Sequence, residues 1–226
     1  MADPRFIHLH MHTEFSMVDS MVRIKKLVPR LQELNMPAIA ITDQTNMCAL
    51  VKFYGATQGA GIKPIIGTDF WVQSDGFPFE QFKLTALAKD NKGYNNITVL
   101  ISKAYERGHV DGRAIIDKAW LAEHAEGVIL LSGGRSGDIG KALLKGNNDA
   151  ALDCLGFYQT HFSDSFYLEL IRTGRPDEET YLHMAVAFAT EHHMPVVATN
   201  DVVFLDESEF EAHEIRVSIH DGYTLE

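Results

Sequence analysis

The sequence predicts an α/β fold, in the form of a (β/α) barrel rather than an open doubly wound sheet. Short apolar or β-branched runs alternate along the chain with longer stretches of helical period. Parallel strands need crossover connections, usually helices, so this alternation favours a parallel sheet. Polar residues follow nearly every predicted strand, as they do in barrels, where loops at the carboxyl ends of the strands form the active site.

Each predicted strand is a short apolar run bounded by turn residues. Seven are expected: Phe6–Met11, Ala38–Thr42, Pro64–Val72, Lys83–Ala88, Val128–Ser132, Phe166–Ile171 and Pro195–Thr199. Helical patterns fall between them, at Cys48–Gly59, Asn95–Arg107, Gly137–Lys145, Asp149–Thr160 and Glu178–His193. Pro29 lies inside a further helical stretch, so that helix is expected to start late or to kink there.

The polar clusters distinguish the two α/β architectures. An open sheet binds its ligand at one switch point, whereas a barrel draws site residues from most of its strands. In this sequence the clusters follow most of the predicted strands, which favours the barrel. They are His10–His12, Thr42–Gln44, Gly67–Asp69, Ser132–Arg135, Arg172–Arg175 and Thr199–Asp201.

Length, composition and charge exclude several classes of protein. The 226 residues, 46% of them hydrophobic, suit one domain with a substantial core and contain no apolar run long enough to span a membrane. The N-terminus lacks a signal-peptide pattern, and two cysteines without CxxC spacing predict a cytoplasmic protein without disulfides. The net charge is −11, whereas a domain that grips nucleic acid alone usually has a basic face. We therefore expect no membrane contact and no direct DNA binding by this chain alone.

The segment FIHLHMHTEF carries the strongest chemical signal. His10 and His12 stand two residues apart, so on a strand both imidazoles face the same side and can reach one metal ion. Nearby predicted loops offer carboxylates, and mixed His/carboxylate sites suit Zn, Mn or Fe. The alternative interpretation is that the histidines hydrogen-bond locally and the aspartates cap helices or turns. The candidate carboxylates are Asp19, Asp43, Asp69 and Asp201.

Two further loops have weaker signals. The glycine-rich SGGRSG stretch at 132–137 could present backbone N–H groups to a phosphate, but it lacks Walker or GxGxxG spacing, which favours a simple tight turn. Arg172 and Arg175 could also bind phosphate, with salt bridges across the barrel mouth as the alternative.

Several long segments together resemble one known family. HLHMHTEFSMVD, ALVKFYGATQGAGIKPIIGTDF, LLSGGRSGDIG, LELIRTGRPDEE, PVVATND and AHEIRVSIHDGYTL closely resemble the PHP (polymerase and histidinol phosphatase) domains found at the N-terminus of bacterial DNA polymerase III alpha subunits. The resemblance runs from Arg5 to the last residue. It implies a distorted seven-stranded (β/α) barrel of the PHP type. It also implies that residues 1–226 are a PHP domain cut before its end, with the polymerase palm, thumb and fingers absent.

The resemblance also implies which residues remain from the family's metal site. His10, His12, Asp19 and Asp201 match ligand positions, and Asp69 stands where glutamate is usual. Other ligand positions have changed, and they now hold Gln44, Lys83, Gly134, Thr173 and Val203. A metal cluster needs its ligands to offset the loss of water from the ions, so the resemblance implies at most one divalent ion (Zn, Mn or Fe) and more readily none.

Loss of metal would leave the remaining aspartates facing one another, which is costly in a partly buried site. We therefore hypothesise that nearby cations neutralise Asp19, Asp69 and Asp201 in place of metal. The candidate cations are Lys83, Arg135 and Arg172.

The function implied by the resemblance is a supporting one in DNA replication. The domain is expected to support a DNA-directed DNA polymerase (a nucleotidyltransferase) and to dock the proofreading exonuclease (epsilon) subunit. Its other partners would be the rest of the polymerase III holoenzyme, with DNA contacted only through the full alpha subunit, and the domain alone is expected to be inactive. The alternative is a metal-dependent phosphoesterase or 3′–5′ exonuclease with partial activity, and histidinol-phosphatase-like hydrolysis is more remote.

Overall fold

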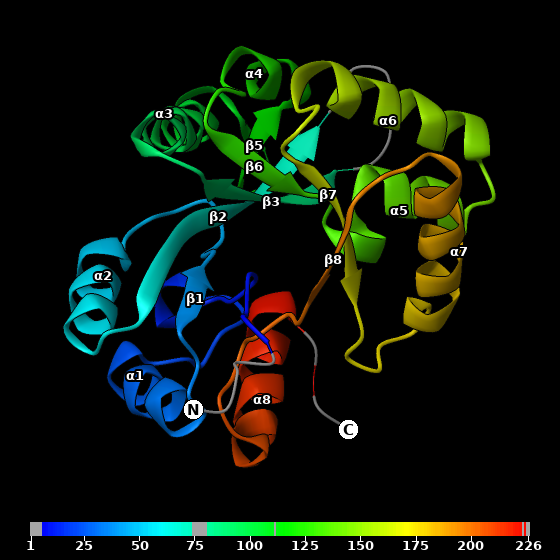
Figure 1. Cartoon of the computed structure of the whole chain (residues 1–226). Helices are drawn as coiled ribbons and strands as arrows, with labels where there is room; N and C mark the ends of the chain where they lie inside the picture. Colours follow the sequence, from blue (N-terminus) through cyan, green and yellow to red (C-terminus); the bar gives the residue numbers. More distant parts are fainter. Residues whose placement is uncertain (1–5, 74–80, 111, 223, 225–226) are drawn as a thin grey trace. The chain divides into compact units, whose positions relative to one another are not determined.

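The computed structural model describes residues 6–73, 81–110, 112–222 and 224, and helices alternate with strands along the chain (Figure 1). The chain divides into two compact units. The first comprises Met1–Ile66 and Asn200–Glu226, and the second comprises Gly67–Thr199. One strand, β2 (Lys63–Gln73), begins in the first unit and ends in the second.

The first unit holds the N-terminal histidines. Its elements are η1 (Glu14–Ser16), α1 (Ile24–Glu33), β1 (Ala38–Ile41), α2 (Leu50–Gly59), the start of β2, η3 (Glu207–Glu209) and α8 (Phe210–Asp221). The strands β1 and β2 run parallel, with Ala38 opposite Lys63. The helices α1 and α2 pack against each other, and their apolar side chains join β1 in one core that includes Met11, Leu27, Ile39 and Phe53.

Residues 8–12 form an extended segment between β1 and Val202. On one side the Ala40 and Thr42 amides donate to the carbonyls of His8 and Met11. On the other side the His12 amide donates to the Val202 carbonyl, and Met11 forms an isolated parallel bridge with Val202. This double pairing fixes the register of the histidine segment.

The second unit is built on a mixed sheet. After β2 come β3 (Phe82–Ala88), α3 (Asn91–Arg107), β4 (His109–Val110), β5 (Arg113–Asp117), α4 (Lys118–Glu123), β6 (Val128–Leu131), η2 (Gly134–Ser136), α5 (Asp138–Leu144), α6 (Asn148–His161), β7 (Phe166–Ile171), α7 (Glu178–Glu191) and β8 (Val196–Thr199). The strand order is β4-β5-β2-β3-β6-β7-β8.

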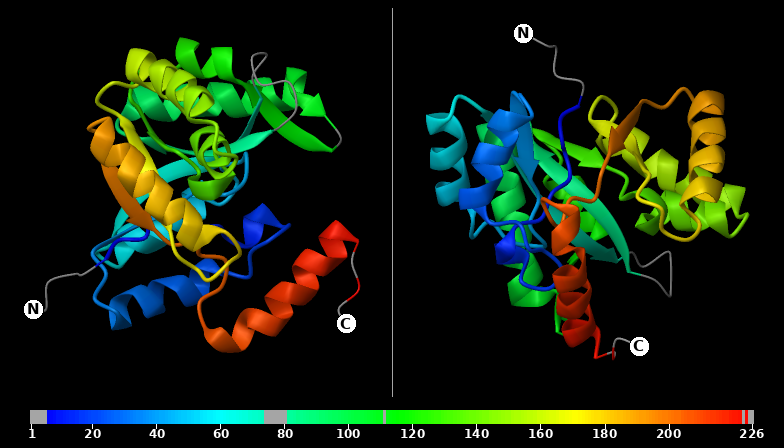
Figure 2. Two further views of the ribbon diagram at one scale, coloured as in Figure 1. Left: turned by 90° about the vertical axis from the view of Figure 1, so that its right-hand side faces the viewer. Right: turned by 90° about the horizontal axis from the view of Figure 1, so that it is seen from below.

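The helices of the second unit cover this sheet. The helix α3 contacts β3, β5 and β6, and α5 contacts both α6 and α7 (Figure 2). The side chain of Asp90 caps α3 by accepting from the Gly93 amide at 2.9 Å, as an N-cap residue does. The sheet side of the core is fully buried at Phe70, Leu84 and Leu130.

The predicted α/β class is confirmed, but three details of the sheet were wrong. The strand β3 runs antiparallel to β2 and β6, because the short connection after β2 cannot hold the crossover helix that a parallel neighbour requires. The segment Phe6–Met11 is extended without being a regular strand. The short strands β4 and β5 were not predicted, and neither was the short helix α4 that follows them.

The first helix, α1, begins at Ile24 and contains Pro29, so it does not start late, and the alternative of a kink at Pro29 stays a prediction. Among the described helices, none has the length and apolar character that crossing a membrane requires.

Candidate metal centre

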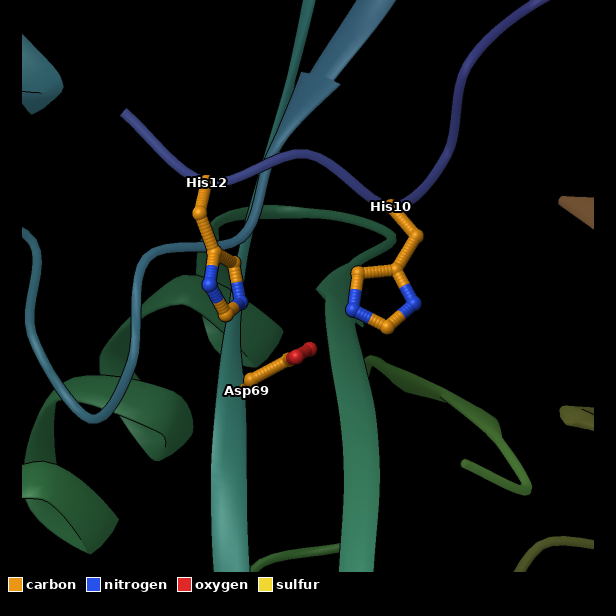
Figure 3. A group of neighbouring side chains, drawn as sticks. All are labelled: His10, His12 and Asp69. Carbon is orange, nitrogen blue, oxygen red and sulfur yellow. The ribbon is translucent and has the colours of Figure 1, made fainter. Parts of the chain in front are cut away.

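His10 and His12 lie on one side of the extended N-terminal segment (Figure 3). Their ring centroids are 5.7 Å apart, and both residues are buried. The shared side follows from the extended backbone, which turns alternate side chains to the same face. The structure therefore brings together the two imidazoles that the sequence singled out.

Asp19 lies against His12. The Nδ1 atom of His12 is 2.9 Å and 3.0 Å from the two carboxylate oxygens of Asp19. With Nδ1 protonated, His12 donates to the carboxylate and presents Nε2 as its ligand atom. Metal-binding histidines commonly donate their second nitrogen to a carboxylate in this way, which fixes the tautomer and the ring orientation.

Asp201 lies near His10. The Nε2 atom of His10 is 4.0 Å from Oδ1 of Asp201, which is longer than a hydrogen bond. Asp201 is held there because its neighbour Val202 pairs with the histidine segment, its amide donating to the His10 carbonyl at 3.3 Å. The first unit thus brings His10, His12, Asp19 and Asp201 together.

Asp43 supports the backbone of the histidine segment. Its buried carboxylate accepts from the Thr13 amide, from Thr13 Oγ1 at 2.7 Å and from Ser16 Oγ at 3.0 Å. Burial raises the pKa of Asp43, while the hydrogen bonds from Thr13 and Ser16 and the nearby His12 oppose that rise. Asp43 was a candidate carboxylate ligand from the sequence, and these contacts give it a structural role.

Asp69 lies in the second unit, on β2. It is buried and faces Thr85 of β3, whose Oγ1 donates to Oδ1 of Asp69 at 2.6 Å. Figure 3 draws Asp69 with His10 and His12. Two imidazoles and one carboxylate are donor types that fit Zn, Mn or Fe.

The three cations proposed to replace metal have other contacts in the second unit. Lys83 places Nζ 5.1 Å from the Trp71 ring centroid. Arg172 pairs with Glu179, and Arg135 donates to the Pro176 carbonyl at 3.3 Å. The neutralisation of Asp19, Asp69 and Asp201 by these cations stays a prediction.

The positions that the resemblance marks as changed ligands have the following contacts in the structure. Thr173 gives both its amide and its hydroxyl to the Glu178 carboxylate. The buried Val203 offers its carbonyl to the Met21 amide at 2.8 Å. Gly134 has φ +56°, which favours glycine. The backbone N–H of Gln44 donates to Ser16 Oγ at 3.0 Å.

Glu178, which was not predicted as a functional residue, holds the loop Thr173–Arg175. Its carboxylate accepts from the amides of Thr173, Gly174 and Arg175 and from the Thr173 hydroxyl. Desolvation alone raises the pKa of Glu178, but these hydrogen bonds together lower it below its ordinary value of 4.5. The acidic first turn after Pro176 was visible in the sequence, but the fold of the preceding loop was not.

The sequence is similar to those of known proteins along its whole length. The chain is 62% identical to the DNA polymerase III subunit alpha of Vibrio cholerae serotype O1 and 58% identical to that of Escherichia coli K12, in each case over 226 residues that cover the whole chain. The chain spans about a fifth of the length of these relatives, since the matched region is 20% of each.

A solved structure shares the fold at low sequence identity. It is an amidohydrolase from Chromobacterium violaceum with bound sulfate and no metal, with a TM-score of 0.56, 13% identity and coverage of 93% of this chain and 96% of that one. A family model described as the PHP domain matches residues 8–173. This match takes in the histidine segment, Asp69 and the loop at Thr173, and the chain belongs to the PHP domain family.

Proposed function

We propose that this chain is the PHP domain of a replicative DNA polymerase III alpha subunit, and that it acts in DNA replication as a scaffold for the polymerase and a docking site for the proofreading exonuclease (epsilon) subunit. The observation that carries the proposal is the match of the whole chain to alpha subunits at 62% and 58% identity. In this proposal the polymerase palm, thumb and fingers belong to the remainder of the full-length protein, and DNA is contacted only through that larger polypeptide.

The contacts at the former ligand positions support a scaffolding role. The Thr173 amide and hydroxyl donate to Glu178, and the backbones of Val203 and Gln44 hydrogen-bond to Met21 and Ser16, so all three residues take part in holding loops and turns. A cluster of metal ions would lack several ligands and could not offset the cost of dehydration. We therefore propose that the domain alone does not hydrolyse phosphate esters.

Docking is tested by titrating the purified chain with the epsilon subunit and measuring binding by calorimetry. Binding with a dissociation constant in the micromolar range or tighter supports the docking role. An absence of measurable binding at about 100 μM, which corresponds to less than about 5.5 kcal/mol of binding free energy, contradicts it. An epsilon subunit that lacks its C-terminal segment is the matched control, because we expect that segment to carry the contact.

The second candidate function is a residual metal-dependent phosphoesterase or 3′–5′ exonuclease. It is favoured by the donor types of His10, His12 and Asp69, and by Asp19 and Asp201, which lie beside the two histidines. These residues would hold at most one Zn, Mn or Fe ion, which would supply a polarised water or phosphate oxygen when bound. His10 and His12 would orient that ion, and Asp19 would hold the His12 ring.

Metal content separates the two candidates. The measurement is elemental mass spectrometry on protein purified without a His-tag or chelator, for the wild type and a His10→Ala/His12→Ala variant. Near-stoichiometric metal that disappears in the variant supports the enzyme and warrants nuclease assays. Background metal in both proteins supports a metal-free scaffold.

A further inference from the structure

The helix α8 is thinly attached to the first unit. Among its residues with a described side chain, His213 is the buried one, and Phe210, Ile215 and Ile219 are strongly exposed. Arg216 nevertheless reaches back across the unit. Its Nε donates to the Met17 carbonyl at 2.7 Å, and its Nη1 lies 3.4 Å from Sδ of Met21.

These two contacts hold both ends of one turn. The turn runs from Met17 to Met21 and carries Asp19 at its centre. Met17 has φ +50°, a conformation that is unfavourable for a residue with a side chain, and the Arg216 hydrogen bond is made to the carbonyl of this residue. Ser20 Oγ donates to the His12 carbonyl at 2.7 Å, which ties the same turn to the histidine segment.

We infer that Arg216 is a positioning residue for the His12–Asp19 pair, because it fixes the turn that presents the Asp19 carboxylate to His12 Nδ1. The inference rests on the proposed role of His12 as a ligand of a divalent ion. The described contacts of Arg216 are with Met17 and Met21, not with Nε2 of His12, the expected ligand atom. Arg216 acts by limiting where the Asp19 carboxylate can lie.

The guanidinium of Arg216 suits these two contacts, with the Met17 carbonyl and the Met21 sulfur, better than another cation would. One planar group offers several N–H donors in fixed directions, so it can hold a carbonyl and a thioether at the same time. A lysine ammonium on a flexible chain could keep the charge and one hydrogen bond but not this two-point geometry. Arg216→Lys therefore preserves the charge but cannot make both contacts, with the Met17 carbonyl and the Met21 sulfur, at once.

The experiment compares Arg216→Lys and Arg216→Ala with a matched control, Lys26→Ala. Lys26, on α1, also ties the segment before α8 to the rest of the first unit, through Glu209 at 3.0 Å, and among the described contacts this side-chain bond does not involve the Asp19 turn. The first readout is the pair of ring ¹⁵N chemical shifts of His12 in metal-free protein, at a pH where the ring is neutral. The second is the dissociation constant for Mn²⁺ or Zn²⁺, measured by calorimetry.

We expect the wild type and Lys26→Ala to show His12 protonated on Nδ1. Both Arg216 variants should shift the His12 tautomer ratio at least about twofold and weaken ion binding about 10-fold, at the lower end of the effect of losing an outer-shell partner. An unchanged tautomer ratio in Arg216→Ala overturns the inference. So does an equal change in Lys26→Ala, because loosening α8 would then explain both results.

The two proposals fail in different ways. If the wild type binds no ion but Arg216→Ala still shifts the His12 tautomer, the metal-binding proposal fails and the positioning role stands. If the wild type binds an ion and neither Arg216 variant changes the tautomer or the affinity, the positioning role fails alone.

Discussion

The Nζ atom of Lys118, the first residue of α4, lies 2.7 Å from Oδ2 of Asp138, the first residue of α5, and both side chains are buried. The hydroxyl of Tyr158 on α6 donates to the same oxygen at 2.8 Å. Burial, followed by the charge of Asp138, raises the pKa of Tyr158 well above its ordinary value, so the phenol stays a donor. One carboxylate thus joins three helices of the second unit.

We expect Asp138→Asn to destabilise the chain by about 3–5 kcal/mol, because it leaves the Lys118 ammonium buried without its counter-charge. Urea unfolding followed by circular dichroism measures this. The control is Lys103→Met, which removes a partly exposed pair with Glu123 and should cost less than about 1 kcal/mol. Similar decreases in the free energy of unfolding in both variants would show that burial does not determine how much the Lys118–Asp138 pair stabilises the chain.

Glu178→Gln should destabilise the chain at pH 7 by about 1–3 kcal/mol, because a charged acceptor of three amides becomes a neutral one. The pKa of Glu178 is lowered on folding, so its contribution is present above pH 4.5 and is lost as the pH falls through the lower, folded-state pKa.

Unfolding free energies measured between pH 3 and pH 7 should therefore converge for wild type and Glu178→Gln at the acidic end. Glu179→Gln is the neighbouring control, since Glu179 is an exposed residue paired with Arg172. A gap between wild type and Glu178→Gln that is independent of pH would contradict the assignment of that gap to the carboxylate charge.

Gly93→Ala and Gly55→Ala should have opposite effects. A Cβ at Gly93 would lie 1.7 Å from the Gly127 carbonyl oxygen, so α3 would have to move away from the turn before β6, at a cost of about 1–3 kcal/mol or more. Gly55 lies inside α2 with no atom within 4 Å of its would-be Cβ, and alanine there should stabilise the helix by about 0.5–1 kcal/mol. Thermal unfolding of both variants checks the pair. Equal shifts of the melting temperature, with the same sign in both variants, would contradict the close approach of Gly93 to the Gly127 carbonyl.

Lys83→Met tests the replacement of metal by cations. Lys83 contacts the Trp71 ring, so we expect its loss to cost about 0.5–1 kcal/mol, the range of an exposed cation–π contact, with no change in metal content. A loss of several kcal/mol that Asp69→Asn relieves in the double variant would instead show that Lys83 neutralises Asp69.

The histidine pair could be predicted from the sequence because it depends on local geometry. An extended backbone places every second side chain on one side, so His10 and His12 had to share a face once the segment was extended. The α/β class could also be predicted, because the periods of helices and strands are local features of the sequence. Most helices were found within a few residues of their observed ends, for example α3 at Asn91–Arg107 against the predicted Asn95–Arg107.

The rest depends on pairings between distant residues, which one sequence does not reveal. The direction of β3 depends on which strands it joins, and the Lys118–Asp138 pair forms only when α4 and α5 meet. Asp19 was predicted as a metal ligand, but its contact with His12 Nδ1 depends on the shape of the Met17–Met21 turn. That turn in turn depends on Arg216, almost 200 residues later along the chain.

The exposure of α8 has a consequence for motion on the seconds-to-hours timescale. A helix that buries so little surface should open by local unfolding at a small fraction of the global free energy, and its amide protons should exchange with solvent early. Each opening withdraws Arg216 from the Met17 carbonyl, so the amide protons of Val18 to Met21 should lose protection together with those of α8. Warming would then release the Asp19 turn well below the melting temperature of the chain, while the β1–β2 core remains closed to exchange.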